Sequence, residues 1–233
     1  MACDVVVFGA HPDDAEMGMG GTVAKLAHAG RSVLLVSLTR GERGTHGSPA
    51  EREREAAAAA EVLGCRHRLL DFPDAALEYS VEARGRLVGL VRELAPGIVF
   101  APYHDNRFGH HDGAAHVDHL ATGALVRDAL KLARMRGVMP DLPAHDVRRL
   151  FYYMVPRDRL PTFVVDVSVE METLVRALQA YATQMRIERR GNSILDILQT
   201  FRRHYGVAAG CTYAEAFLSE EALQVDAETL FRI

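Results

Sequence analysis

Short apolar runs alternate with longer amphipathic stretches through the first half of the chain. The apolar runs are rich in β-branched and aliphatic residues, as strands buried on both faces should be, and lie at 5–8, 32–38, 67–72 and 98–101. Helical patterns follow them at 17–29, 49–64, 81–94 and 117–136. This order predicts an α/β, Rossmann-like open sheet, mostly parallel, with helices on both faces.

The second half continues without a break in composition. Further strands are expected near 150–155 and 163–167, and further helices near 172–185 and 194–205. We therefore expect a single domain over residues 1–233.

Polar loops follow three of the predicted strands, at 9–16, 39–48 and 102–116. In an open parallel sheet, ligands bind where the carboxyl ends of the strands meet their loops. The functional site is therefore expected at this edge of the sheet.

The first loop places one histidine beside three carboxylates, in the sequence His-Pro-Asp-Asp-Ala-Glu at 11–16. Asp13 or Asp14 would also suit the cap of the following helix. Capping accounts for one carboxylate but not for the whole cluster. The loop therefore favours metal binding or acid–base chemistry.

Five of the 11 histidines lie between positions 104 and 119. His104, His110 and His111, taken singly, are typical of a solvated polar loop. His116 and His119 are three residues apart at the start of a predicted helix, so they share one face. Asp118 lies between them and supplies the carboxylate that commonly fixes the tautomer of an imidazole.

Together the two clusters offer His11, Asp14 and His119 as metal ligands. Three nitrogen and oxygen ligands with an open fourth position are typical of catalytic zinc. Asp13 would then be free to accept a proton from the attacking water. His116 would stabilise an oxyanion or protonate a leaving amine.

Composition and missing motifs exclude several other functions. A net charge of −4 predicts no surface for nucleic acid or anionic lipid. The chain contains no dinucleotide fingerprint, P-loop or hydrolase elbow. No uncharged run reaches the length of about 18 residues that a membrane span needs. The start of the chain lacks a signal-peptide pattern, and the 3 cysteines are far apart, so a cytoplasmic protein is expected.

The two histidine motifs, at 11–16 and 116–119, resemble those of the zinc-dependent LmbE-like (PIG-L-type) N-acetylglucosamine deacetylases. The resemblance extends over nearly the whole chain. Its further segments are 38–42, 52–55, 72–74, 101–102 and 213–217. Length and the last of these segments look most like the bacillithiol-pathway branch, which deacetylates N-acetylglucosaminyl malate.

The resemblance implies the same roles as the residues do. His11, Asp14 and His119 would hold zinc, with ferrous iron as the alternative, Asp13 would be the base, and His116 would be oriented by Asp118. The run Glu51–Glu55 is typical of a solvated helix face on composition alone. The resemblance instead implies that Arg52 faces the substrate, where it would bind the malate carboxylates. Relatives of this type are homo-oligomers, often hexamers.

The chain departs from the family pattern at one place. The family usually runs Asp-Arg directly into His-Pro-Asp-His, whereas residues 108–115 separate Arg107 from His116 here, and Val117 replaces the proline. This leaves open whether Arg107 binds the substrate. The inserted His110-His111-Asp112 competes for the ligand role, but a helical pattern continues only from 116–119.

Two alternatives to the bacillithiol assignment remain. The substrate could be another small molecule that contains N-acetylglucosamine, such as free GlcNAc, chitobiose or a mycothiol-type conjugate. The protein could also be a non-catalytic metal-binding protein that uses the histidine-rich insertion. Asp13 argues against the second alternative, because a storage site has no need of a base.

Overall fold

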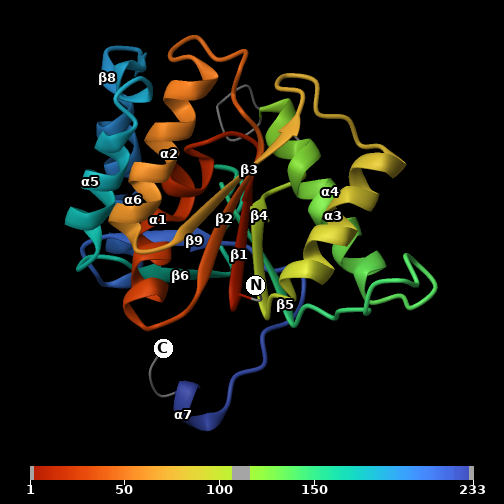
Figure 1. The fold of residues 1–233 in the computed structure, drawn as a ribbon. Helices are drawn as coiled ribbons and strands as arrows, with labels where there is room; N and C mark the ends of the chain where they lie inside the picture. The colour runs from red at the N-terminus through yellow and green to blue at the C-terminus, as the bar shows by residue number, and fades with distance from the viewer. Residues whose placement is uncertain (1–2, 107–115, 231–233) are drawn as a thin grey trace.

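The structure is a computed structural model and describes residues 3–106 and 116–230. Its centre is a five-stranded parallel sheet in the order β3-β2-β1-β4-β5 (Figure 1). The strands are β1 (Val5–Gly9), β2 (Val33–Thr39), β3 (Arg66–Phe72), β4 (Ile98–Pro102) and β5 (Arg149–Tyr153). The predicted α/β fold class is confirmed.

Two layers of helices cover the sheet (Figure 1). One layer contains α1 (Asp14–His28), α2 (Pro49–Leu63) and α5 (Met171–Ala180), and the other contains α3 (Val81–Leu94) and α4 (Val117–Ala133). Side chains alternate between these layers along β1. Val5 and Val7 belong to the core under α1 and α2, and Val6 and Phe8 to the core under α3 and α4. This double burial explains the continuous apolar run in the sequence.

The helix α2 begins and ends where its sequence signals indicate. The Ser48 hydroxyl accepts a hydrogen bond from the backbone of Glu51, whose carboxylate accepts one from Ser48, and Pro49 occupies the first turn. Gly64 ends the helix at φ 71°. Other helix ends differ from expectation by a few residues: α1 begins at Asp14 and α4 ends at Ala133.

The last third of the chain adds a smaller layer behind α1. It contains the antiparallel pair β6 (Phe163–Asp166) and β9 (Ala214–Phe217), the hairpin of β7 (Glu188–Arg189) and β8 (Asn192–Ser193), the short helix η2 (Gln184–Arg186), α6 (Ile194–Ala209) and α7 (Ala227–Leu230). Leu218 extends β9 to the edge strand β5 through a bridge with Tyr152. The described helices include none that is both long and apolar enough to span a bilayer.

Glycines allow α1 to pack unusually close to its neighbours. A Cβ atom on Gly18 would lie 2.3 Å from the ring of Tyr153, and one on Gly21 would lie 2.8 Å from Val167. The Tyr153 hydroxyl donates a hydrogen bond of 2.8 Å to the carbonyl of Phe8 in β1. The glycine run is therefore a packing feature, which agrees with the absence of a dinucleotide fingerprint.

The strand order places the predicted site at a switch point. β1 and β4 are neighbours in the sheet, but α1 leaves β1 toward one face and α4 follows β4 on the other. Loops that diverge in this way leave a crevice at the carboxyl ends of the strands. The two histidine motifs therefore meet although more than 100 residues separate them, since His11 and Asp118 differ by 107 positions.

Candidate active site

The loop after β1 is built around Asp14. One of its oxygens, Oδ2, accepts hydrogen bonds of 2.8 Å from the backbone N–H groups of both Ala10 and His11. The same oxygen lies 3.5 Å from Nδ1 of His11. The other oxygen, Oδ1, lies 3.0 Å from Nε2 of His119, in the first turn of α4. Asp14 therefore joins the two motifs.

Three imidazoles surround this contact. The ring centroid of His11 lies 5.0 Å from that of His116 and 5.4 Å from that of His119, and the last two are 5.3 Å apart. Their ligand nitrogens lie within 4.8 Å of one another, so His116 is a further donor candidate. Nδ1 of His119 is buried and has no hydrogen-bond partner among the described residues.

The donor set fits a zinc ion. Ligand atoms held at 2.0–2.2 Å around a tetrahedral ion lie about 3.3–3.5 Å apart. Asp14 lies against two of the imidazoles, with Oδ1 3.0 Å from Nε2 of His119 and Oδ2 3.5 Å from Nδ1 of His11. Imidazole nitrogens and a carboxylate oxygen are also ligands that zinc prefers. Among the described residues, two groups could hold a metal ion: His11 with His116 and His119, and His11 with Asp74 and Asp118. Asp14 contacts two histidines of the first group, so the predicted ligands His11, Asp14 and His119 lie together.

The charges of the site also favour a bound cation. Burial acts to lower the pKa of His11, but Asp14, Asp118 and Asp74 outweigh burial and raise it to about 12. Burial raises the pKa of Asp14, yet His119 and His11 reverse that effect and hold it well below its usual range. Carboxylates this closely packed need positive charge beside them.

Asp13 lies next to the metal ligands and is held by Arg52. Nη2 of Arg52 donates a hydrogen bond of 3.2 Å to the Asp13 carboxylate and one of 2.6 Å to the carbonyl of Pro12. Nη1 donates a hydrogen bond of 3.1 Å to the carbonyl of Gly41. Burial, aided by Asp14 and opposed by Arg52, raises the pKa of Asp13 to about 8.

These contacts change the interpretation of Arg52. The side chain is only 4% exposed, so the solvated helix face predicted from composition is wrong at this position. The resemblance implied a clamp for substrate carboxylates. In the structure Asp13 and two loop carbonyls accept hydrogen bonds from both terminal nitrogens, whereas Nε is buried without a hydrogen-bond partner among the described residues.

Asp118 also has a different partner from the expected one. Its carboxylate lies 3.2 Å from Nε2 of His11 and accepts backbone hydrogen bonds from Ala75 and Leu77. The backbone N–H of Asp118, and not its carboxylate, donates a hydrogen bond of 3.2 Å to Nδ1 of His116. Asp118 therefore orients His11 and not His116, because α4 turns its carboxylate toward the loop after β3.

Sequence reasoning missed Asp74. This residue follows β3, and its Oδ1 lies 3.0 Å from Nε2 of His11. The signal that could have found it is its position at the carboxyl end of a parallel strand. The spacing of Glu215 in the sequence likewise predicts no function. In the structure this residue is 2% exposed, and its carboxylate binds Arg202 and the backbone of α1 at Gly21 and Thr22.

Part of the predicted site lies outside the described residues. Arg107 and the inserted His110-His111-Asp112 fall in this part of the chain. The residues that lead to them contact the end of the chain and the segment after β5 through a hydrogen bond and an ion pair. His104 lies 2.8 Å from Glu220, and Asp105 lies 2.8 Å from Arg159.

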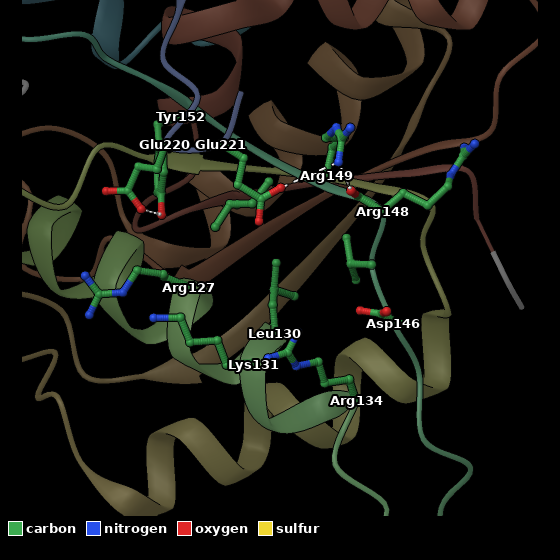
Figure 2. A pocket seen from close by; sticks show the side chains of 12 residues that line it. Arg127, Leu130, Lys131, Arg134, Asp146, Arg148, Arg149, Tyr152, Glu220 and Glu221 are labelled. Atoms are coloured by element: carbon green, nitrogen blue, oxygen red, sulfur yellow. Dashed lines mark hydrogen bonds and ion pairs between the residues drawn. The ribbon is translucent and has the colours of Figure 1, made fainter. Parts of the chain in front are cut away.

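A cavity of about 150 Å³ lies apart from the histidines, between α4 and the segment around β5 (Figure 2). Arg127 and Lys131 of α4 face Glu220 and Glu221 across it. Several of these groups already pair with carboxylates, as Arg149 does with Glu221 at 3.5 Å. None of the predicted site residues lines this cavity.

The sequence model of the PIG-L family, described as GlcNAc-PI de-N-acetylase, matches residues 6–130. This span covers both histidine motifs and more than half of the chain. The chain belongs to the PIG-L family. The resemblance seen in the sequence is thereby confirmed at the level of the family.

Relatives of this PIG-L member support an enzyme. It is 31% identical to a diacetylchitobiose deacetylase of Thermococcus kodakarensis over 88% of this chain and 78% of that protein. An N,N′-diacetylchitobiose deacetylase from Pyrococcus horikoshii, solved with an inhibitor, has a TM-score of 0.81 at 28% identity, over 93% of this chain and 83% of that one. These names confirm the predicted enzyme class, an N-deacetylase.

A third relative matches almost end to end. The conserved protein TT1542 from Thermus thermophilus has a TM-score of 0.86 at 34% identity, and the match covers 97% of this chain and 98% of that one. The five-stranded sheet and its helices are therefore the fold of the family.

Proposed function

We propose that this protein is a zinc-dependent deacetylase that hydrolyses the N-acetyl group of a small molecule containing N-acetylglucosamine. The observation that carries the proposal is the Asp14 carboxylate between His11 and His119, with Asp13 held beside it by Arg52. Family membership and the named relatives support the same reaction.

The side chains divide the reaction between them. A bound zinc ion would supply Lewis acidity that polarises the amide carbonyl and activates water. Asp13 accepts a proton from the water that attacks the carbonyl carbon. His116 donates from Nε2 to the developing oxyanion, because its Nδ1 already accepts from the backbone of Asp118. The C–N bond then breaks, the proton passes from Asp13 to the amine, and acetate and the amino sugar leave.

The finer substrate assignment has two candidates. The sequence resemblance favours N-acetylglucosaminyl malate, the substrate of the bacillithiol branch. The deacetylases of Thermococcus and Pyrococcus that this chain matches are named for diacetylchitobiose. Because Arg52 is committed to Asp13, the malate carboxylates would need another cation, and Arg107 is the remaining candidate from the sequence.

Acetate release tests the proposal. The zinc-loaded protein is incubated with N-acetylglucosaminyl malate, N,N′-diacetylchitobiose and free GlcNAc at equal concentrations. Preference for the malate conjugate supports the bacillithiol assignment, and preference for the disaccharide supports a chitobiose deacetylase. Absence of acetate from all three, with metal bound, contradicts the proposal and favours a metal-binding protein. The same assay with ferrous iron compares the two metals.

The variant Asp13→Asn tests the role of the base. An amide cannot accept the proton, so we expect acetate release to fall about 10²–10⁴-fold. Metal affinity should stay near that of the wild type, because Asp13 is not in the ligand set. Asp71→Asn is the matched control, since Asp71 is an exposed carboxylate on β3 that binds Arg86. Equal activity of Asp13→Asn and wild type would refute the assignment.

A further inference from the structure

Nε2 of His11 faces two carboxylates at once. Asp74 Oδ1 lies 3.0 Å from it, and Asp118 Oδ2 lies 3.2 Å from it. Both carboxylates are nearly buried, with 6% and 1% of their side chains exposed. An imidazole in a metal site usually has one such partner. The second carboxylate therefore needs an explanation.

The backbone holds Asp74 in place. Its Oδ2 accepts a hydrogen bond of 2.8 Å from the backbone N–H of Arg43. Its own backbone N–H donates a hydrogen bond of 2.8 Å to the carboxylate of Glu42. These contacts tie the loop after β3 to the loop after β2. Ala75, the next residue, has a φ of 56° and donates 2.7 Å to Asp118. A non-glycine residue in this region is uncommon and indicates that the surrounding contacts fix the turn.

We propose that Asp74 is a positioning residue that works with Asp118 to keep the hydrogen of His11 on Nε2. The Nδ1 lone pair of His11 then points to the metal side of the ring, where Asp14 lies 3.5 Å away. This inference rests on the proposed function only in taking His11 as a metal ligand. It assigns a role to the loop after β3, which contains no ligand of the proposed set.

The two contacts of Nε2 predict how zinc affinity should respond to substitutions at Asp74 and Asp118. His11 has one hydrogen on Nε2 and two acceptors for it. When one carboxylate is lost, the other still fixes the tautomer, so each single change should weaken metal binding less than the double change. Outer partners of metal ligands typically contribute 10–100-fold to affinity. We therefore expect losses that are more than additive for the double variant.

Metal affinity, measured by competition with a chromophoric chelator, tests the inference. The variants are Asp74→Asn, Asp118→Asn and the double variant, with Asp71→Asn as the control. We expect about a 10-fold loss of zinc affinity for each of Asp74→Asn and Asp118→Asn, more than about 100-fold for the double variant, and none for the control. The visible spectrum of the cobalt-substituted protein should change in Asp74→Asn, since the orientation of a ligand has changed.

Three outcomes would overturn the inference. Zinc affinity of the double variant equal to that of Asp118→Asn alone would remove the role. A lower melting temperature of the metal-free variant, with unchanged affinity and cobalt spectrum, would make Asp74 purely structural. Binding of two metal ions by the wild type and one by Asp74→Asn would make Asp74 a ligand. Acetate release does not enter these readouts, so failure of the proposed substrate class leaves the inference testable.

Discussion

Asp13 has a backbone φ of 107°, a conformation that side chains of L-amino acids rarely adopt. Such a conformation persists only where the surrounding contacts fix it. Here the contacts come from Arg52, which binds Asp13 and the preceding carbonyl, and from Asp14, which binds two backbone N–H groups of the same loop. The proposed base and the proposed ligand therefore share one constrained turn.

Arg52→Lys should separate the base from the ligands. A lysine has one ammonium group and cannot reproduce the planar fork that reaches Asp13, Pro12 and Gly41. We expect kcat to fall by about 10-fold or more while zinc affinity stays within about 2-fold of the wild type. Arg54→Lys, on an exposed position of the same helix, is the control. A loss of affinity as large as the loss of kcat would contradict the assigned role.

His67 should make folding stability depend on pH. Its imidazole bonds Ser37 at 2.9 Å, and burial lowers its pKa from 6.5 to about 4. Between these values the unfolded chain binds more protons than the folded one, so stability falls as the pH drops from about 6.5 to about 4. The contribution approaches about 1.4 kcal/mol for each pH unit.

Urea unfolding of the wild type and of His67→Gln over this pH range measures the effect. Glutamine can still bond Ser37 but does not titrate, so the difference in stability between the two proteins should shrink or reverse at low pH. Parallel pH profiles for the two proteins would show that His67 is not the source.

At the scale of the elements, the position of α1 depends on the absence of side chains. Gly18→Ala would place a methyl group against the ring of Tyr153. Because the ring is buried against the helix, we expect a loss of about 1–3 kcal/mol in the free energy of unfolding. Gly89→Ala is the matched control, since nothing lies within 4 Å of its added Cβ in α3.

Thermal and urea unfolding compare the two variants. The control should gain about 0.5–1 kcal/mol, because alanine favours the helix interior over glycine. A shift of the same sign in both proteins would show that the contact with Tyr153 is not decisive.

The sequence predicted most elements because their signals are local. The double-buried strands, the capping box of α2 and the range of α3 depend on neighbours within a few residues. The partners of Asp118 and Arg52 could not be predicted in this way. Leu77 lies 41 positions from Asp118, and Asp13 lies 39 positions from Arg52. Only the packing of the helices determines these contacts.

At the scale of the whole molecule, metal should stabilise the fold. Zinc at about 100 times its dissociation constant adds about 2.7 kcal/mol if the unfolded chain does not bind it. For a protein of this size, each kcal/mol raises the melting temperature by about 2–4 °C. Differential scanning fluorimetry should therefore show a rise of about 5–10 °C with zinc, reversed by a chelator. His119→Ala should not respond, and an equal rise in that variant would place the metal elsewhere.

The supports of the site come from the far end of the chain. Glu16 accepts a hydrogen bond from Tyr181, 165 positions later, and Gly21 donates to Glu215, 194 positions later. His104, just after β4, contacts Glu220, 116 positions later. Local patterns carry no information on such pairs, which explains why the partners of Glu215 could not be predicted from its spacing.

This arrangement has a consequence for synthesis on the ribosome. All the proposed metal ligands and the base have been translated by residue 119. Three residues whose side chains hold β1 and α1 in place are translated only afterwards, namely Tyr153, Tyr181 and Glu215. A nascent chain that stops soon after α4 therefore carries every donor atom without the contacts that hold the donors together. The contacts around the proposed ligands are therefore complete only after Glu215 has been translated.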